Sequence, residues 1–231
     1  MKRGLMKHIR PFRIFTLIDA SSSDHIVRLP IPARRGLGSI SLLETFLIIA
    51  TAKLVGATRI FEFGTFFGST TLNLALNVPE DAEIFTLDLG REQTTALQQH
   101  PADALLTSMH LGAENMFEFL GDPVSRKITT LTGDSTKFDF SPWKDSIDLV
   151  FIDGGHDLAT VRSDTDSASR VIRKDKPSCI LWHDYGNLDC SDLTAFLDEQ
   201  SQQLDIFHVE DTMLCVWFNG SCGDIRTRLR A

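Results

Sequence analysis

The chain has 231 residues, of which 42% are hydrophobic and 23% are charged, and this suits one globular domain with a single substantial core. Its formal net charge of −8 argues against a nucleic-acid partner, because such affinity comes mainly from cationic side chains that neutralise phosphates. No signal peptide is recognised, and the most apolar run, residues 42–55, is too short to span a bilayer. We therefore expect a cytoplasmic protein with no membrane span.

The first segment, residues 1–38, is basic and irregular. Residues 1–36 hold eight Lys or Arg and two Asp, and each proline in this stretch disfavours helix at the residue before it. We expect an N-terminal arm with a short helix and an extended part. The arm is either solvated, wrapped around a second subunit or closed over the functional site, and the main domain covers residues 39–231.

A helix is expected at residues 42–55. Ser41 is a candidate N-cap, and Glu44 stands three residues later, as in a capping box. The apolar residues of this run cover more than one helix face, which indicates burial against the sheet and a second element. A partner subunit is one candidate for that element, so we expect a homodimer.

From residue 59 onward, strand-like and helix-like runs alternate, as in parallel α/β sheets. Two later runs, 205–209 and 213–218, are separated by the polar sequence EDT and predict a hairpin. The expected fold is α/β: a Rossmann-like, doubly wound and mostly parallel sheet with an antiparallel C-terminal hairpin. The candidate strands before the hairpin are 59–63, 84–89, 127–132, 147–153 and 178–183, and the candidate helices are 68–77, 91–99, 112–120, 157–173 and 191–203.

The stretch FEFGTFFGSTT, residues 61–71, has the character of a nucleotide-cofactor loop. Gly64 and Gly68 permit positive φ and a close approach of the backbone to a ligand. Ser69 and Thr70 are candidate caps for the helix that follows. Glu62, at the end of the strand, is expected to project its carboxylate into the same crevice.

Every expected parallel strand ends in a carboxylate or an imidazole. Ligands of doubly wound sheets bind outside the carboxyl ends of the strands, so these ends supply the candidate site residues. The alternative is that single carboxylates at strand ends cap helices. The residues are Glu62, Asp88, Asp134 with Ser135, Asp153 with His156, and His183 with Asp184.

Two kinds of cofactor are candidates for this crevice, a dinucleotide and S-adenosylmethionine. Asp88 lies 20 residues after Gly68, the separation at which an acid meets the ribose hydroxyls of a nucleotide. The loop lacks the central glycine of GxGxxG, which disfavours a dinucleotide, whereas an acidic crevice suits the sulfonium and amino groups of S-adenosylmethionine. An NAD-dependent oxidoreductase stays open as the alternative.

Five segments, in this order and spacing, resemble the class I S-adenosylmethionine-dependent methyltransferases. The chain is most similar to a bacterial branch with an FID-x-x-H segment, a branch that also resembles macrolide-sugar O-methyltransferases and cephalosporin hydroxylase-like proteins. The resemblance covers roughly residues 40–218. The segments are FEFGTFFGSTTLNLA, TLDLG, GDS at 133–135, FIDGGH at 151–156 and ILWHDY at 180–185.

The resemblance implies a seven-stranded methyltransferase sheet and a small-molecule methyl acceptor, such as a sugar or secondary metabolite. It implies that Glu62, Gly64, Thr65 and Gly68 form the methionine and ribose side of the cofactor pocket. It also implies that Asp88 binds the ribose, that Asp134 and Ser135 lie beside the adenine, and that Asp153 borders the cofactor. A hydroxylase-like or regulatory member of the fold that binds metal without methyl transfer remains a further alternative.

The catalytic candidates are Asp153, His156, His183 and Asp184. His156 is a candidate general base, because imidazole has an unperturbed pKa near neutrality. Asp153, His183 and Asp184 occupy the ligand positions of metal-dependent O-methyltransferases, and a histidine among them favours manganese, iron, zinc or no metal over magnesium. The structural alternative is that Asp153 caps the next helix and the pair hydrogen-bonds to it.

Other residues receive structural interpretations. Asp164 and Asp166 are expected on a solvated helix face. The four cysteines, Cys179, Cys190, Cys215 and Cys222, show no CxxC spacing and are expected to be buried free thiols.

Overall fold

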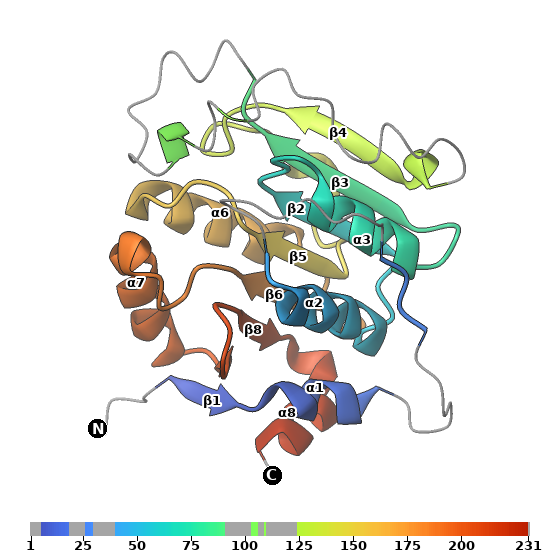
Figure 1. Ribbon diagram of the computed structural model, residues 1–231, viewed down its shortest axis with the longest axis vertical. Coiled ribbons are helices and arrows are strands. Elements are labelled where there is room, and N and C mark those ends of the chain that lie inside the picture. The colour runs from blue at the N-terminus through green and yellow to red at the C-terminus, as the bar shows by residue number, and fades with distance from the viewer. Residues whose placement is uncertain are drawn as a thin grey trace.

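One mixed sheet of eight strands forms the centre of the computed structural model, which describes residues 6–18, 26–29, 40–90, 103–105, 109 and 124–230. The strand order is β1-β7-β8-β6-β5-β2-β3-β4 (Figure 1). All neighbours are parallel except β8, which is antiparallel to β6 and β7. The α/β fold with an antiparallel C-terminal hairpin is therefore confirmed. The strands are β1 (Lys7–Ile9), β2 (Arg59–Phe63), β3 (Glu83–Asp88), β4 (Ile128–Thr132), β5 (Leu149–Ile152), β6 (Cys179–Trp182), β7 (Ile206–Val209) and β8 (Cys215–Phe218).

Most expected helices are present with slightly different bounds. The expected helices at 91–99 and 112–120 lie outside the described residues. The final helix, α8, and the 3-10 turns, labelled η, were not expected. The helices are α1 (Pro11–Leu17), α2 (Leu42–Leu54), α3 (Ser69–Asn77), α6 (Leu158–Val171), α7 (Ser191–Ser201) and α8 (Gly223–Arg230), with turns η2 (Ser125–Lys127), η3 (Ser141–Trp143), η4 (Leu188–Cys190) and η5 (Gly220–Cys222).

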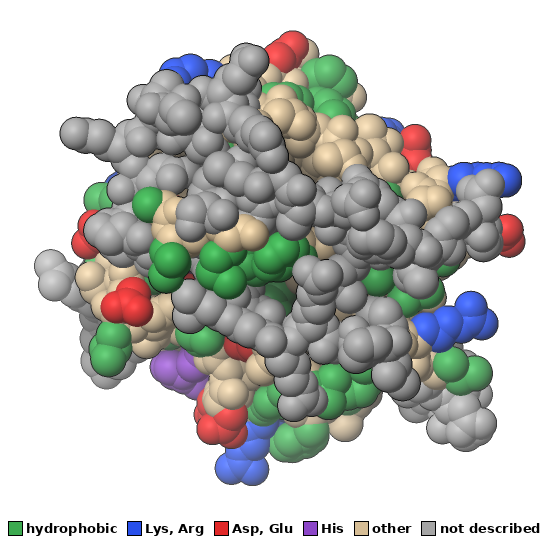
Figure 2. Space-filling model, turned by 45° about the horizontal axis from the view of Figure 1, so that its top comes forward, with side chains coloured by type: hydrophobic (Ala, Val, Ile, Leu, Met, Phe, Trp, Pro, Cys, Tyr) green, Lys and Arg blue, Asp and Glu red, His purple; other side chains and the backbone are tan. Residues whose placement is uncertain are grey.

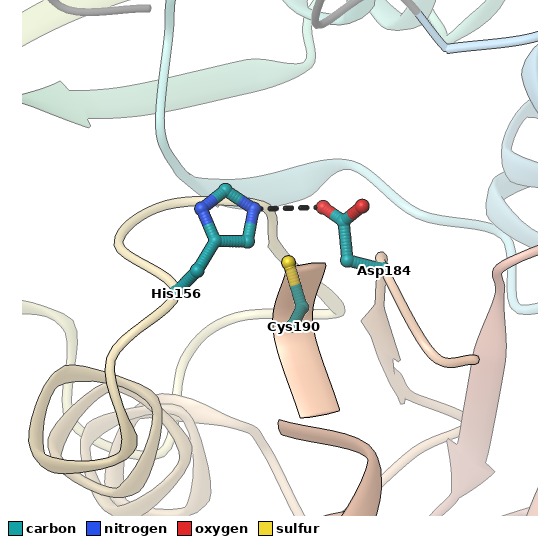
Figure 3. Close-up of side chains that lie close together, drawn as sticks. All are labelled: His156, Asp184 and Cys190. Carbon is teal, nitrogen blue, oxygen red and sulfur yellow. Dashed lines mark hydrogen bonds and ion pairs between the residues drawn. The ribbon is translucent and has the colours of Figure 1, made fainter. Parts of the chain in front are cut away.

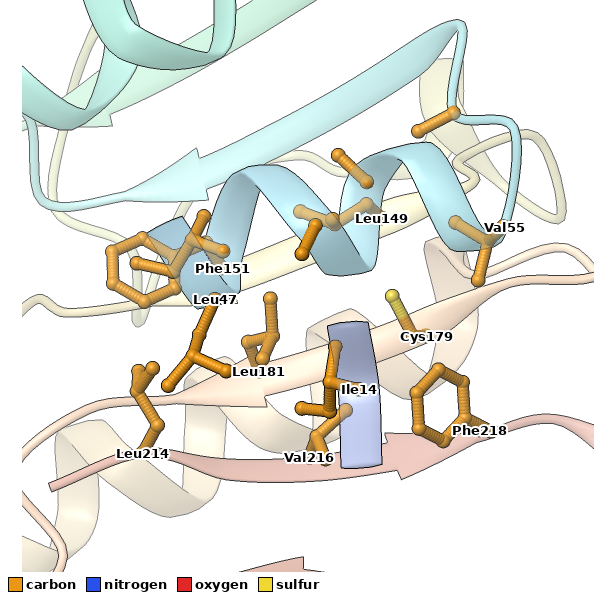
Figure 4. Close-up of a cluster of buried hydrophobic side chains, with 14 of the residues drawn as sticks. Ile14, Leu47, Val55, Leu149, Phe151, Cys179, Leu181, Leu214, Val216 and Phe218 are labelled. Carbon is orange, nitrogen blue, oxygen red and sulfur yellow. The ribbon is translucent and has the colours of Figure 1, made fainter. Parts of the chain in front are cut away.

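Helices cover both faces of the sheet, and each face has its own apolar core. On one face, side chains of α1, α2, α3 and α8 pack on alternate strand residues such as Leu149, Phe151 and Leu181 (Figure 4). On the other face, α6 and α7 pack on Val150, Ile152 and their neighbours. Burial of both faces explains why the central strands are near-continuous apolar runs instead of alternating ones.

The N-terminal arm contributes to the sheet and to this core. Strand β1 pairs in parallel with β7. It adds an eighth strand to the seven that the sequence predicted. Helix α1 follows it and contacts α2 and α8, and its Ile14 is fully buried. Because α1 covers α2 within one chain, the burial of α2 does not require a second subunit. The boundary between residues 38 and 39 remains a prediction.

The start of α2 confirms the expected capping box. The Ser41 hydroxyl accepts the backbone N–H of Glu44, and the Glu44 carboxylate accepts the backbone N–H of Ser41. The caps expected for α3 are wrong. Its N-cap is Gly68, with φ +74, which has no side chain to form a capping bond, and Ser69 and Thr70 lie inside the helix.

The strand order reverses between β2 and β5. From β2 the chain proceeds to β3 and β4 on one side, and then returns to β5 on the other side. Phe63 and Ile152 are register partners, so Gly64 and Asp153 follow them side by side. Gly64 has φ +88, and a Cβ atom on it would lie 2.1 Å from the carbonyl oxygen of Asp153. Only glycine permits this approach.

The structure of helix α6 excludes the alternative in which Asp153 caps it, and it corrects the expectation for Asp164. Its N-cap is Asp157, whose carboxylate accepts the N–H groups of Ala159 and Thr160, so Asp153 is not the cap. Asp166 is exposed, as expected, but Asp164 is only 1% exposed and lies against Gly154 and Ser135. Burial raises the pKa of Asp164 to about 7, although a hydrogen bond with Ser135 opposes this shift.

The expectation about the thiols is confirmed. All four cysteines are free and buried. No helix in the described ranges has the length and apolar character needed to cross a membrane. On the face shown in Figure 2, basic and acidic side chains of the described residues both lie along the margin, and the basic ones form no continuous patch.

We predict that Gly64→Ala destabilises the protein much more than Gly186→Ala. Gly186 has φ +82, but no atom of the described residues lies within 4 Å of the place that its Cβ would take. Both variants incur a positive-φ cost of about 1–2 kcal/mol, and Gly64→Ala adds an overpacking cost of about 1–3 kcal/mol. Urea unfolding of the two variants measures the difference, and equal losses of stability would show that the close contact at Gly64 is absent.

We predict that Asp164→Asn removes a pH-dependent cost to stability. A carboxyl with a raised folded pKa binds more protons folded than unfolded, so the free energy of unfolding falls as pH rises from about 4 to 7. Relative to wild type, the variant should gain stability over this window, by at most about 4 kcal/mol above pH 7. Urea unfolding at pH 5 and pH 8 tests this, with Asp166→Asn as the exposed control on the same helix. The same pH slope in all three proteins would contradict it.

Candidate active site

The loop after β2 is held by Asp88 at the end of β3. The Oδ2 atom of Asp88 accepts the backbone N–H groups of Thr65 and Phe66, at 3.0 and 2.8 Å, and its Oδ1 atom accepts that of Leu89. The backbone N–H of Gly64 donates to the carbonyl of Leu87. The sequence-predicted residues Gly64, Thr65 and Asp88 are therefore brought together at one corner of the site.

The expectation that Glu62 projects its carboxylate into the crevice is wrong. It is buried, and its Oε2 atom accepts the hydroxyls of Thr86, at 2.6 Å, and Thr71. Burial raises the pKa of Glu62 to about 8, because the two hydroxyls only partly offset the desolvation of its carboxylate. The side chain thus connects β2 to β3 and α3 beneath the loop.

Asp134 and Ser135 directly follow Gly133, whose backbone N–H donates to the carbonyl oxygen of Asp88 at 2.9 Å. The Asp134 carboxylate accepts the backbone N–H and hydroxyl of Thr136 and forms an ion pair with Lys137. Ser135 contacts the buried Asp164. The bonds of Asp134 close a local turn after β4.

The ends of β5 and β6 form a compact cluster of acids and imidazoles. His183 Nδ1 lies 3.2 Å from Asp153 Oδ1 and 3.1 Å from Asp184 Oδ2. Asp184 has φ +63, a left-handed conformation that is uncommon outside glycine. The ring of His156 joins from the β5–α6 loop, with its Nε2 atom 2.8 Å from Asp184 Oδ2, and Cys190 lies beside this pair (Figure 3).

Two carboxylates that sequence reasoning missed complete the cluster. Asp103 bonds with His156 through both the backbone N–H, at 3.0 Å, and ring Nδ1. Glu44, from α2, places its Oε1 atom 3.5 Å from His183 Nε2 and also accepts the N–H of Met213 at 2.8 Å. The sequence signal for Glu44 was its capping box, which gave no sign of this second contact, and Asp103 belongs to no motif.

The titratable groups of the cluster have strongly shifted pKa values. Burial alone lowers the pKa of His156, but hydrogen bonds with Asp103 and Asp184 outweigh it and raise the pKa to about 10. The pKa of His183 is likewise raised against its burial, chiefly by the Asp153 carboxylate. Burial raises the pKa of Asp153, while bonds to both imidazoles outweigh burial and lower that of Asp184.

This charge pattern defines what the site can hold. Four carboxylates, those of Glu44, Asp103, Asp153 and Asp184, surround two imidazoles, so the cluster keeps an excess of negative charge even with both rings protonated. It therefore suits a positively charged group. Single donor atoms of Asp153, His183 and Asp184 lie within 4.8 Å of one another, as do those of His156, Asp184 and Cys190. Either set offers the mixed donors that transition metals accept.

The same architecture occurs in solved methyltransferases. The O-methyltransferase TomG from Streptomyces achromogenes, involved in tomaymycin synthesis and solved with SAM, is 16% identical with a TM-score of 0.51, over 79% of this chain and 82% of that one. The SAH-bound methyltransferase PaMTH1 from Podospora anserina is 16% identical with a TM-score of 0.53, over 79% and 80%. A methyltransferase from Geobacter sulfurreducens is 11% identical with a TM-score of 0.54, over 79% and 80%. At these identities the likeness shows the shared fold.

Family membership rests on the sequence. No curated protein sequence matches the chain. The family model described as a methyltransferase domain matches residues 61–185, more than half of the chain. The matched range begins in β2 and ends at Tyr185, one residue after Asp184, and so spans the loop of β2, Asp88 and most of the acid–imidazole cluster. The chain belongs to the methyltransferase domain family.

Proposed function

We propose that this protein transfers a methyl group from S-adenosylmethionine to a hydroxyl oxygen of a small molecule, such as a sugar or secondary metabolite. We place it in the branch with an FID-x-x-H segment, on the basis of FIDGGH at residues 151–156. Membership of the methyltransferase domain family supports the reaction type. The fold shared with an O-methyltransferase solved with SAM supports the donor and the choice of oxygen.

One observation carries the proposal. The glycine loop after β2 and the acid–imidazole cluster after β5 and β6 meet where the strand order reverses, at the contact between Gly64 and Asp153. Ligands of doubly wound sheets bind at this place. A negatively charged cluster beside the loop suits a cofactor with a sulfonium and an amino group, whereas it opposes the pyrophosphate of a dinucleotide.

The cofactor residues that we propose surround this contact. When bound, S-adenosylmethionine supplies an electrophilic methyl group on a positively charged sulfur. Asp88, already joined to the loop, is proposed to bind the ribose, because both vicinal hydroxyls can donate to one carboxylate. The remaining residues proposed for the pocket are Gly64, Thr65 and Gly68 on the loop side, with Glu62 supporting the loop from beneath, Asp134 and Ser135 on the adenine side, and Asp153 beside the methyl group.

His156 is proposed as the general base. At rest its imidazole is charged at neutral pH, because two carboxylates hold its proton. When the acceptor hydroxyl takes the place of Asp184 at Nε2, one of these two contributions is lost, the pKa of the ring falls toward neutrality, and the Nε2 proton passes to solvent. His156 then removes the hydroxyl proton as the oxygen attacks, while Asp184 keeps its bond with His183.

A divalent metal is proposed as a second cofactor at Asp153, His183 and Asp184. The donor set fits such an ion, because its two oxygens and one imidazole nitrogen lie close together in a negatively charged site. The mixed donors favour manganese, iron or zinc over magnesium, which prefers oxygen ligands alone. There the ion would polarise the acceptor hydroxyl. His183 would then bind it in place of its present bonds with the two carboxylates.

We predict that the protein binds S-adenosylhomocysteine in isothermal titration calorimetry. Asp88→Ala should weaken binding by at least about tenfold, since a lost charge-assisted hydrogen bond costs roughly 1.5–3 kcal/mol. His156→Gln should leave the dissociation constant within about twofold, because its role lies in proton transfer. Asp166→Asn controls for a lost surface charge. Absence of binding by folded wild-type protein would overturn the proposed function.

We predict that purified protein retains about one equivalent of a transition metal after dialysis, as measured by mass spectrometry. Asp153→Asn should lose the metal, because it removes a charged ligand. Cys190→Ser serves as the matched control, because Cys190 belongs only to the alternative donor set with His156 and Asp184. Loss of metal in Cys190→Ser with retention in Asp153→Asn would assign the ion to that alternative set, and a metal-free wild type would exclude both.

A further inference from the structure

We infer that Asp103 is the positioning residue that orients His156 for methyl transfer. The inference rests on the proposed function and adds to it a residue that no motif identifies. Both carboxylate oxygens of Asp103 bond to the same residue: Oδ2 accepts the backbone N–H of His156 at 3.0 Å, and Oδ1 bonds with ring Nδ1. The two side chains are almost equally buried, with 13% and 11% of their surfaces exposed.

The two bonds restrict two different motions. The bond to the backbone N–H holds the β5–α6 loop, in which Gly154 and Gly155 precede His156 and allow the backbone more freedom than other residues would. The bond to Nδ1 fixes the rotation of the imidazole ring. Asp103 therefore sets both where the ring lies and which way it faces.

This orientation determines which nitrogen can react. Because Nδ1 is committed to Asp103, Nε2 is the nitrogen that faces Asp184 and the centre of the cluster (Figure 3). Once the ring is neutral, a carboxylate beside Nδ1 keeps the remaining proton on that atom, which leaves Nε2 to accept one. His183 is turned the other way, because its Nδ1 atom faces Asp153 and Asp184 at the centre of the cluster and its Nε2 atom lies toward Glu44.

Three substitutions at residue 103 separate the two bonds. Asp103→Asn retains an oxygen for the backbone N–H but presents an amide N–H to Nδ1, which favours the opposite tautomer and blocks Nε2 as an acceptor. Asp103→Ala removes both bonds. Asp103→Glu keeps the carboxylate and should restore part of the activity. Asp166→Asn is the control for charge.

The kinetic test follows S-adenosylhomocysteine release with the best acceptor from a panel of hydroxylated sugars and phenols. Asp103→Asn should lower kcat on the order of 10²-fold, toward the lower end of what a general base contributes. The KM for S-adenosylmethionine and the melting temperature should stay close to wild type. In a His156→Gln background, Asp103→Asn should have no further effect. A kcat within twofold of wild type, or an additive loss in the double variant, would overturn the inference.

A second readout does not depend on turnover. Long-range ¹H–¹⁵N NMR of histidine-labelled protein, with the His156 signals assigned from their loss in His156→Gln, should show a protonated Nδ1 that changes in Asp103→Asn. Identical ring signals in wild type and Asp103→Asn would refute the contact itself. Changed signals in a protein that binds no S-adenosylhomocysteine would retain the contact, overturn its catalytic role and identify the proposed function as the part that failed.

Discussion

The contact between Gly64 and the Asp153 carbonyl is the constraint on which the site depends. It lies where the strand order reverses, and it brings the loop after β2 against the end of β5 at a distance that a side chain would prevent. Below it, the buried Glu62 joins β2 to its neighbours through the hydroxyls of Thr71 and Thr86. Beside it, Asp88 holds the loop by two backbone bonds. The loop therefore faces the acid–imidazole cluster before any ligand binds.

The cluster itself is organised by shared carboxylates. Asp184 bonds with both His156 and His183, so the two rings are coupled through one side chain. Glu44 and Asp103 lie at the two outer ends of this chain of contacts. Buried ionised groups are stable only when paired, and these pairs explain how six titratable side chains coexist in a largely buried site. The same arrangement leaves negative charge available for a cationic ligand.

The sequence predicted the repeating parts of the fold better than the particular contacts. Apolar runs and capping residues located the strands and the start of α2, because those signals are local. The pairing of β1 with β7 escaped prediction, since three residues carry no period. Asp164 was placed on a solvated face, because helix spacing cannot show that the β5–α6 loop covers it. Asp103 and Glu44 reach the site only through tertiary contacts. Asp103 is 53 residues from His156 in the sequence, and Glu44 is 139 residues from His183.

We propose that the methyl donor binds between the loop after β2 and the acid–imidazole cluster, and every catalytic role proposed above depends on that position. A crystal structure of the complex with S-adenosylhomocysteine tests it most directly. We expect the sulfur to lie between the Gly64–Gly68 loop and Asp153, with His156 Nε2 facing the space where the methyl group would stand. A ligand bound elsewhere on the sheet, or with its sulfur turned away from Asp153 and His156, would contradict this position.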